Sequence, residues 1–173
     1  MNAMESRIQL VQGDITRVDA DAIVTAANEG LRGGGGVDGA VHRAAGPELV
    51  EASLALAPCP AGEARITGGF NLNAKYVIHA VGPVFQNLED DSATLASAYE
   101  SALSLAAEYG ANRIAFPCIS TGVYGFPKRE ACRIAITTVT NWMKTHKLPE
   151  CAIFCCFEQQ DFALYQEELL QIG

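Results

Sequence analysis

Two polar residues that could do chemistry stand on either side of a run of four glycines. Asn28 precedes the run at residues 33–36, and Asp38 follows it after a single valine. Glycine has no Cβ, so its backbone can come close to a ligand. The carboxylate could complement the dipole of a helix N-terminus, or it could position or deprotonate a water molecule. The amide could serve a turn, or it could form hydrogen bonds with a sugar hydroxyl.

The glycine run contains a formal G-x-G-x-x-G pattern at Gly34, Gly36 and Gly39. A dinucleotide-binding fold needs this pattern in a tight turn directly after a strand. Here residues 27–33 separate it from the expected strand, so we interpret the match as a coincidence. The chain also lacks a G-x-x-x-x-G-K-[ST] sequence, which excludes a P-loop nucleotidase at the level of motifs.

A second glycine-rich segment, ISTGVYGFP, occupies residues 119–127 and contains neither lysine nor arginine. Its successive backbone N–H groups could form a concave anion site. Taken alone, the segment is more typical of an ordinary turn from a strand to a helix. Two such loops at the ends of two strands favour a diphosphate held between them by main-chain amides.

Other candidate residues have both an ordinary and a functional interpretation. Asp14 follows the first expected strand, where it could cap a turn or accept a hydrogen bond from an exocyclic amine, as on adenine. Phe157 is apolar among apolar neighbours and typical of a core, yet at a strand end its ring could stack on a base, and Tyr124 has the same two possibilities. No Cys–His pairing or metal-ligand spacing involves His42 or His79, so we interpret both as structural.

The elements that must position these residues alternate between strands and helices. The strands are short and apolar, as expected where helices cover both faces of a sheet. We predict strands at residues 7–11, 22–26, 64–70, 75–81, 113–119 and 151–157, and helices at 37–45, 47–56, 90–109, 127–144 and 161–170. This order predicts an α/β fold, a three-layer α/β/α sandwich with a central mixed, mostly parallel sheet. Ligands of such sheets bind beyond the carboxyl ends of strands, so the candidate residues would surround one cleft if their strands are neighbours.

Composition limits the classes of function. The 173 residues predict a single domain, and the net charge of −8 disfavours direct nucleic-acid binding, which depends on lysine and arginine. No apolar run is long enough for a membrane span and no signal peptide is evident, so we expect a cytoplasmic protein. The six cysteines form no C-x-x-C pair, and we expect free thiols, no metal and no cofactor.

Four segments of the chain together resemble the macrodomain family. They are GDITRVDADAIVTAANEGLRGGGGVDGAVHRAAGPEL, YVIHAVGP, AFPCISTGVYGFP and FCCFEQQDFALY. The resemblance extends over about residues 7–165 and is closest to the MacroD-type subgroup, including bacterial members of the Escherichia coli type. It implies ADP-ribose binding and hydrolysis of esters at the distal ribose. Such a protein would deacetylate O-acetyl-ADP-ribose and remove mono-ADP-ribose from acidic residues of modified proteins.

The resemblance also implies roles for individual residues. Asp14 would hold the adenine amine, with the amide of Ile15 beside it, and Phe157 would stack near the adenine. Asn28 would orient the distal ribose and Asp38 a water molecule. The diphosphate would lie between the two glycine-rich loops, bound by Gly35, Gly36, Val37, Ser120, Thr121, Gly122, Val123 and Tyr124.

One residue departs from the family pattern. The family usually has N-A-A-N, whereas this chain has Thr25 followed by Ala-Ala-Asn28. An amide that would brace the distal-ribose region is therefore missing, and the threonine hydroxyl could partly replace it. The alternatives are a non-catalytic reader of ADP-ribose or a regulatory binding module, such as a partner of RNA-processing machinery. Retention of Asn28 and Asp38 favours the hydrolase.

Overall fold

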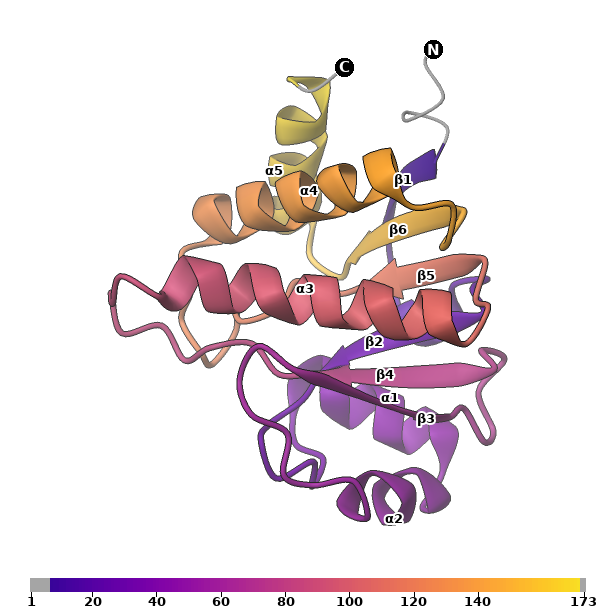
Figure 1. Cartoon of the computed structure of the whole chain (residues 1–173). Helices are drawn as coiled ribbons and strands as arrows, with labels where there is room; N and C mark the ends of the chain where they lie inside the picture. The colour runs from indigo at the N-terminus through magenta and orange to yellow at the C-terminus, as the bar shows by residue number, and fades with distance from the viewer. Residues whose placement is uncertain (1–6, 172–173) are drawn as a thin grey trace.

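A computed structural model describes residues 7–171 and shows six strands and five α-helices in this part of the chain (Figure 1). The strands are β1 (Ile8–Gln12), β2 (Ala22–Ala26), β3 (Ala64–Gly68), β4 (Tyr76–Ala80), β5 (Arg113–Phe116) and β6 (Cys151–Cys156). The helices are α1 (Gly36–Ala45), α2 (Glu48–Leu54), α3 (Asp91–Glu108), α4 (Lys128–Thr145) and α5 (Gln159–Leu170), and a short 3-10 helix, η2 (Ile15–Arg17), follows β1.

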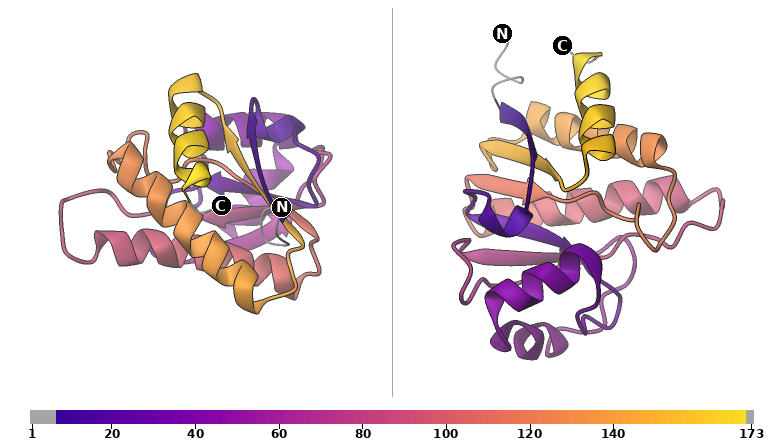
Figure 2. Two further views of the ribbon diagram at one scale, coloured as in Figure 1. Left: turned by 90° about the horizontal axis from the view of Figure 1, so that it is seen from above. Right: turned by 180° about the vertical axis from the view of Figure 1, so that it is seen from behind.

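The strands form one sheet in the order β1-β6-β5-β2-β4-β3. All neighbouring pairs are parallel except β3 and β4, which are antiparallel. Helices α3 and α4 lie on one face of the sheet with α5 beside α4, and α1 lies on the other face with α2 beside it (Figures 1 and 2). The predicted three-layer sandwich with a mixed, mostly parallel sheet is therefore confirmed.

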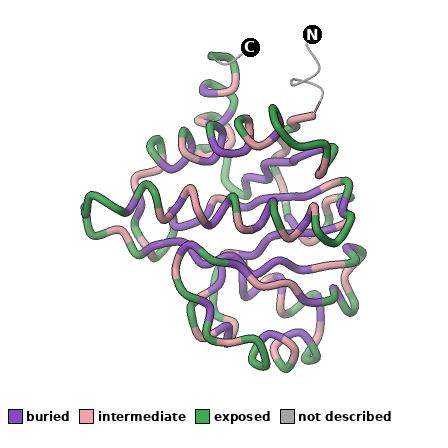
Figure 3. The backbone as a smooth tube through the Cα atoms, in the orientation of Figure 1, coloured by how far each residue is buried: buried purple, intermediate pink, exposed green. Residues whose placement is uncertain are grey.

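Alternation along the strands divides the apolar residues between two cores. Ile23 packs with Val41 of α1 on one side of the sheet, and the next residue, Val24, belongs to the core that contains Leu95 of α3 on the other. Successive side chains of a strand point to opposite faces, so strands that are apolar at every position are buried on both. Figure 3 shows this burial as an almost continuous buried trace through the central strands.

Four predicted boundaries were wrong by two or three residues, including the end of helix α2, which lies at Leu54 rather than at residue 56. Strand β5 ends at Phe116 rather than at residue 119, because Pro117 has no N–H to give to the ladder. Strand β3 ends at Gly68, and Phe70 has a φ of +52°, which no strand residue adopts. Helix α5 begins at Gln159, two residues before its expected start.

The strand order brings together the ends that were expected to hold the site. Strands β1, β6, β5 and β2 are consecutive and parallel, so their carboxyl ends lie at one edge of the sheet. Residues 7–171 contain no helix long and apolar enough to span a membrane and no cluster of three or more His, Cys, Asp or Glu placed to hold a metal. All six cysteines fall within this range and are free thiols.

Candidate active site

A cleft of about 310 Å³ opens between the two glycine-rich loops, beyond the carboxyl ends of β2 and β5. We call it the loop cleft. Its volume is in the range of small-molecule binding sites. Of the predicted site residues, it is lined by Asn28, Gly35, Gly36, Val37, Asp38, Ser120, Gly122, Val123 and Tyr124. The loop cleft therefore brings together two segments more than eighty residues apart in sequence.

The first wall of the loop cleft is the start of helix α1. The N-cap residue, Gly35, has no side chain to cap the helix, and the carbonyl of Gly35 accepts a hydrogen bond from the N–H of Gly39 at 3.1 Å. The N–H groups of Gly36, Val37 and Asp38 precede that first helical bond, so they have no acceptor within the helix. Free amides and a positive dipole end together form an anion-binding site. Gly36 has a φ of +57°, which favours glycine at this position.

The second wall is the loop after β5, and it is held firmly against the end of β4. Ser120 is buried with a φ of +68°, its hydroxyl donates to the carbonyl of Pro83 at 2.9 Å, and its own carbonyl accepts from the N–H of Phe126 at 2.8 Å. Burial raises the pKa of Tyr124, and the charges of nearby acids raise it further, so its hydroxyl stays protonated at neutral pH. Thr121 does not line the loop cleft, and its hydroxyl donates to the carbonyl of Cys118.

Asp38 is the buried carboxylate of the loop cleft, with only 5% of the residue exposed. The fully buried Thr25 donates its hydroxyl to Oδ1 of Asp38 at 2.9 Å, and Nε2 of His42 lies 3.4 Å from the same oxygen. Burial raises the pKa of Asp38, and the hydrogen bond from Thr25 and the charge of His42 partly oppose that rise. The departure at Thr25 thus places a hydroxyl on the candidate catalytic carboxylate.

Asn28 shapes the glycine run with both ends of its amide. Its Nδ2 donates to the carbonyl of Gly33 at 2.9 Å, and its Oδ1 accepts from the N–H of Arg32 at 3.2 Å. A Cβ built on Gly34 would lie 3.8 Å from Nδ2 of Asn28 and 3.9 Å from Oδ2 of Asp38. The amide and the carboxylate therefore border the same glycine. Direct contact of Asn28 with a ribose stays a prediction.

His42 is the residue of this site that the sequence reasoning missed. It was interpreted as structural, yet its ring nitrogen lies beside the carboxylate of Asp38. The signal was present in the sequence, because residues four apart on a helix face each other. His79 is fully buried, its Nε2 lies 3.0 Å from the hydroxyl of Thr67, and its ring centroid is 6.2 Å from that of His42.

The three residues expected at the adenine end lie outside the loop cleft. Asp14 lines a different hollow, of about 340 Å³, and its Oδ1 accepts hydrogen bonds from the hydroxyl and the N–H of Thr16, which lower its pKa. Ile15 is buried. The interpretation of Phe157 as a core residue was wrong: 73% of it is exposed, because β6 ends at the preceding residue. Its ring is free to stack on a ligand.

Comparison with known proteins shows close similarity over nearly the whole chain. A family model described as Macro domain matches residues 24–135. An O-acetyl-ADP-ribose deacetylase of Escherichia fergusonii is 50% identical over 98% of this chain and 99% of its own, and a macro domain-containing protein of Ralstonia nicotianae is 51% identical over 94% of each.

Solved structures agree with the sequence relatives. An Oceanobacillus iheyensis macrodomain with MES bound has a TM-score of 0.92 at 39% identity, covering 95% of this chain and 91% of that one. A Trypanosoma brucei macrodomain in complex with ADP-ribose has a TM-score of 0.92 at 40% identity, covering 97% of this chain and 71% of that one.

Proposed function

This chain belongs to the Macro domain family, and on that premise we propose that it binds ADP-ribose and hydrolyses esters at the distal ribose. The substrates would be O-acetyl-ADP-ribose and proteins carrying mono-ADP-ribose on acidic side chains. One observation supports this function above the others: the buried carboxylate of Asp38 lies in the same cleft as the free amides that begin helix α1.

The loop cleft suits a diphosphate without any basic side chain. The N–H groups of Gly36 and Val37 would bind phosphate oxygens from one side, and the loop at residues 120–124 would cover them from the other. The distal ribose would then lie toward Asn28 and Asp38, and the adenine toward Asp14 and Phe157. We also propose that residues 1–173 form a single macrodomain.

Asp38 has the environment of a group that positions a water molecule. In the proposed reaction the water oxygen adds to the ester carbonyl carbon, and the bond from that carbon to the ribose oxygen breaks. The ribose oxygen takes up a proton, so the products are a free ribose hydroxyl and a carboxylic acid. Asp38 would orient the water and accept its proton, and a raised pKa suits that role near neutral pH. A phosphate of the ligand would assist the attack.

The alternative is a reader that binds ADP-ribose without cleaving it. The hydrogen bond from Thr25 and the proximity of His42 favour hydrolysis, because they hold the carboxylate of Asp38 in one orientation and offset the effect of its burial on ionisation. A regulatory role toward RNA-processing machinery would act through protein contacts, because the charge of −8 opposes direct RNA binding.

Incubation of the protein with two substrates distinguishes the hydrolase hypothesis from the reader hypothesis. The purified protein is mixed with O-acetyl-ADP-ribose and, separately, with a protein ADP-ribosylated on glutamate. We expect catalytic release of acetate from the first and of ADP-ribose from the second, over many turnovers. Binding of ADP-ribose in a calorimeter without release from either substrate would establish the reader instead.

A further inference from the structure

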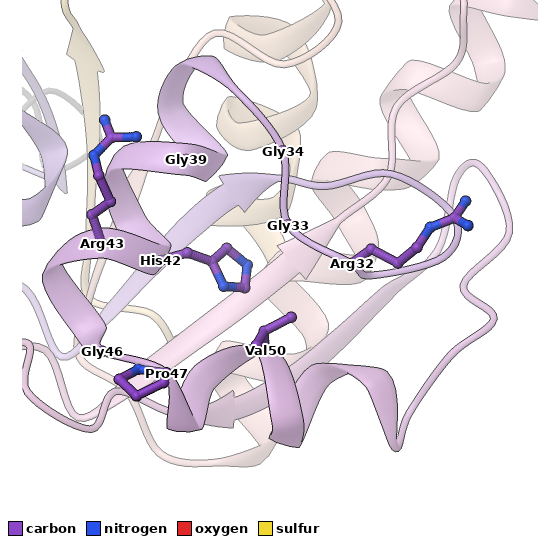
Figure 4. Close-up of a pocket in the computed structure, with 9 residues that line it drawn as sticks. All are labelled: Arg32, Gly33, Gly34, Gly39, His42, Arg43, Gly46, Pro47 and Val50. Atoms are coloured by element: carbon purple, nitrogen blue, oxygen red, sulfur yellow. The ribbon is translucent and has the colours of Figure 1, made fainter.

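A second hollow, of about 440 Å³, shares Gly34 with the loop cleft. Figure 4 shows the residues that line it. We call it the arginine groove. It is bordered by Arg32 and Gly34 from the loop after β2, by His42 and Arg43 from α1, and by Val50 from α2. Gly34 borders both hollows, so a chain that leaves the loop cleft past Gly34 enters the arginine groove.

The two arginines of this groove are available to a partner. Both are exposed, and Figure 4 shows them on opposite sides of the hollow. Within residues 7–171, neither guanidinium forms a hydrogen bond or an ion pair, whereas Arg129 and Arg133 both bind Glu168. No acidic residue is among the described residues that line the groove. Two guanidinium groups that are unpaired within the described part of the chain thus border this hollow on a protein with a net charge of −8.

The floor of the groove is suited to a peptide rather than to a free ion. The ring of His42 points into it, and Val50 and Pro47 add apolar surface (Figure 4). An apolar floor with cationic edges fits a short extended segment that has acidic side chains. The groove also lies against the reactive end of the loop cleft, because His42 contacts Asp38 with its Nε2 atom.

We propose that the arginine groove binds the acidic polypeptide segment that flanks an ADP-ribosylated side chain. This inference rests on the proposed function, since it takes the ester to lie beside Asn28, Gly34 and Asp38. The acyl side of that ester must leave the loop cleft, and a protein substrate continues there for several residues. O-acetyl-ADP-ribose has no polypeptide beyond its acetyl group, so that substrate has no acidic segment to place in the groove.

The test compares substrates that differ only in the flanking charge. One peptide is ADP-ribosylated on a central glutamate between Asp and Glu residues, and the second has Asn and Gln in their place. For the native protein at low ionic strength we expect kcat/KM to be roughly tenfold higher for the acidic peptide, as two partly exposed charge pairs would give. The preference should shrink as salt is added.

Substitution of the two arginines tests whether the preference for the acidic peptide comes from the arginine groove. The double variant Arg32→Gln/Arg43→Gln should lose most of the preference, and Arg32→Lys/Arg43→Lys should keep much of it. The control Lys144→Gln removes an exposed charge at the end of α4 and should behave as the native protein does. Turnover of O-acetyl-ADP-ribose should change by less than about two-fold in all variants, since their folds and loop clefts are intact.

Two results would overturn the inference. The native protein could hydrolyse both peptides equally well, or the glutamine double variant could keep the full preference. In either case hydrolysis itself would still support the proposed function. Failure of the native protein to hydrolyse any of the three substrates would contradict the proposed function instead.

Discussion

Thr25 and Asp38 show how one residue can set the chemistry of its neighbour. They are thirteen residues apart, yet the hydroxyl of Thr25 donates to the carboxylate of Asp38 inside the protein. That bond lowers the pKa of Asp38 against the effect of burial. The sequence reveals the unusual threonine and the spacing of Asp38 from His42. The contact between Thr25 and Asp38 could not be predicted, because it depends on how α1 packs against β2.

The variant Thr25→Val should shift the pH dependence of hydrolysis. Loss of the hydrogen bond raises the pKa of Asp38, and an ionised Asp38 is needed to accept a proton from water. The acidic limb of kcat/KM against pH should therefore move to higher pH. Thr25→Ser keeps the hydroxyl and should leave the limb nearly in place. Superimposable profiles for the valine variant and the native protein would show that Asp38 does not titrate in this reaction.

At the scale of elements, the end of β4 supports the loop after β5. A Cβ added to Gly82 would collide with the hydroxyl of Ser120 and would lie 2.6 Å from Cγ2 of Ile119. Both residues line the loop cleft. Glycine at this position therefore allows the second wall to approach the end of the sheet.

The variant Gly82→Ala should weaken ADP-ribose binding by about tenfold. The added methyl group would push the loop after β5 out of place, and overpacking of this kind costs about 1–3 kcal/mol of free energy. Calorimetric titration with ADP-ribose measures this. Gly68→Ala in β3 is the matched control, because a Cβ there meets nothing within 4 Å. Equal affinities for the two variants would show that the loop adjusts freely.

The elements themselves were largely predictable, and their ends were less so. The alternation of apolar strand and helix patterns identifies every strand and α-helix of residues 7–171, and Pro127 before α4 is a recognisable helix start. The short 3-10 helix η2 was not predicted. Pro117 in the sequence indicates that β5 ends before residue 117. The exposure of Phe157 could not be read from its apolar neighbours, because it depends on the exact residue at which β6 leaves the sheet.

At the scale of the whole molecule, the strand order creates the site. The last strand, β6, lies between the first strand and β5, which places loops from both halves of the chain at one edge. Local sequence patterns predict parallel strands with helices on both faces, but they contain no information on which strands are neighbours. The general rule for open α/β sheets supplied the expectation of a single cleft. The order of β1, β6, β5 and β2 places their ends at one edge, but Asp14 lines a hollow separate from the loop cleft.

The stability of the whole protein should fall on acidification, partly through His79. Burial, together with the charge of His42, lowers the pKa of His79 from 6.5 to about 4. Between these values the unfolded chain binds a proton that the folded protein does not, so unfolding becomes easier as pH falls. From pH 7 to 4.5 this linkage should cost roughly 2 kcal/mol of unfolding free energy. Urea unfolding of the native protein and of His79→Gln at both pH values measures it, and equal losses in the two proteins would exclude His79 as the cause.

The most direct test of the proposed reaction is the variant Asp38→Ala, measured for binding and for turnover. ADP-ribose affinity should stay within a few-fold of the native value, because the backbone amides of the loop cleft do not need the carboxylate. Hydrolysis of O-acetyl-ADP-ribose should be nearly abolished. Asp90→Ala, which removes an exposed carboxylate before α3, should bind and hydrolyse as the native protein does. Turnover by Asp38→Ala at the native rate would contradict the account, and near-complete loss of turnover with ADP-ribose binding retained is the result it predicts.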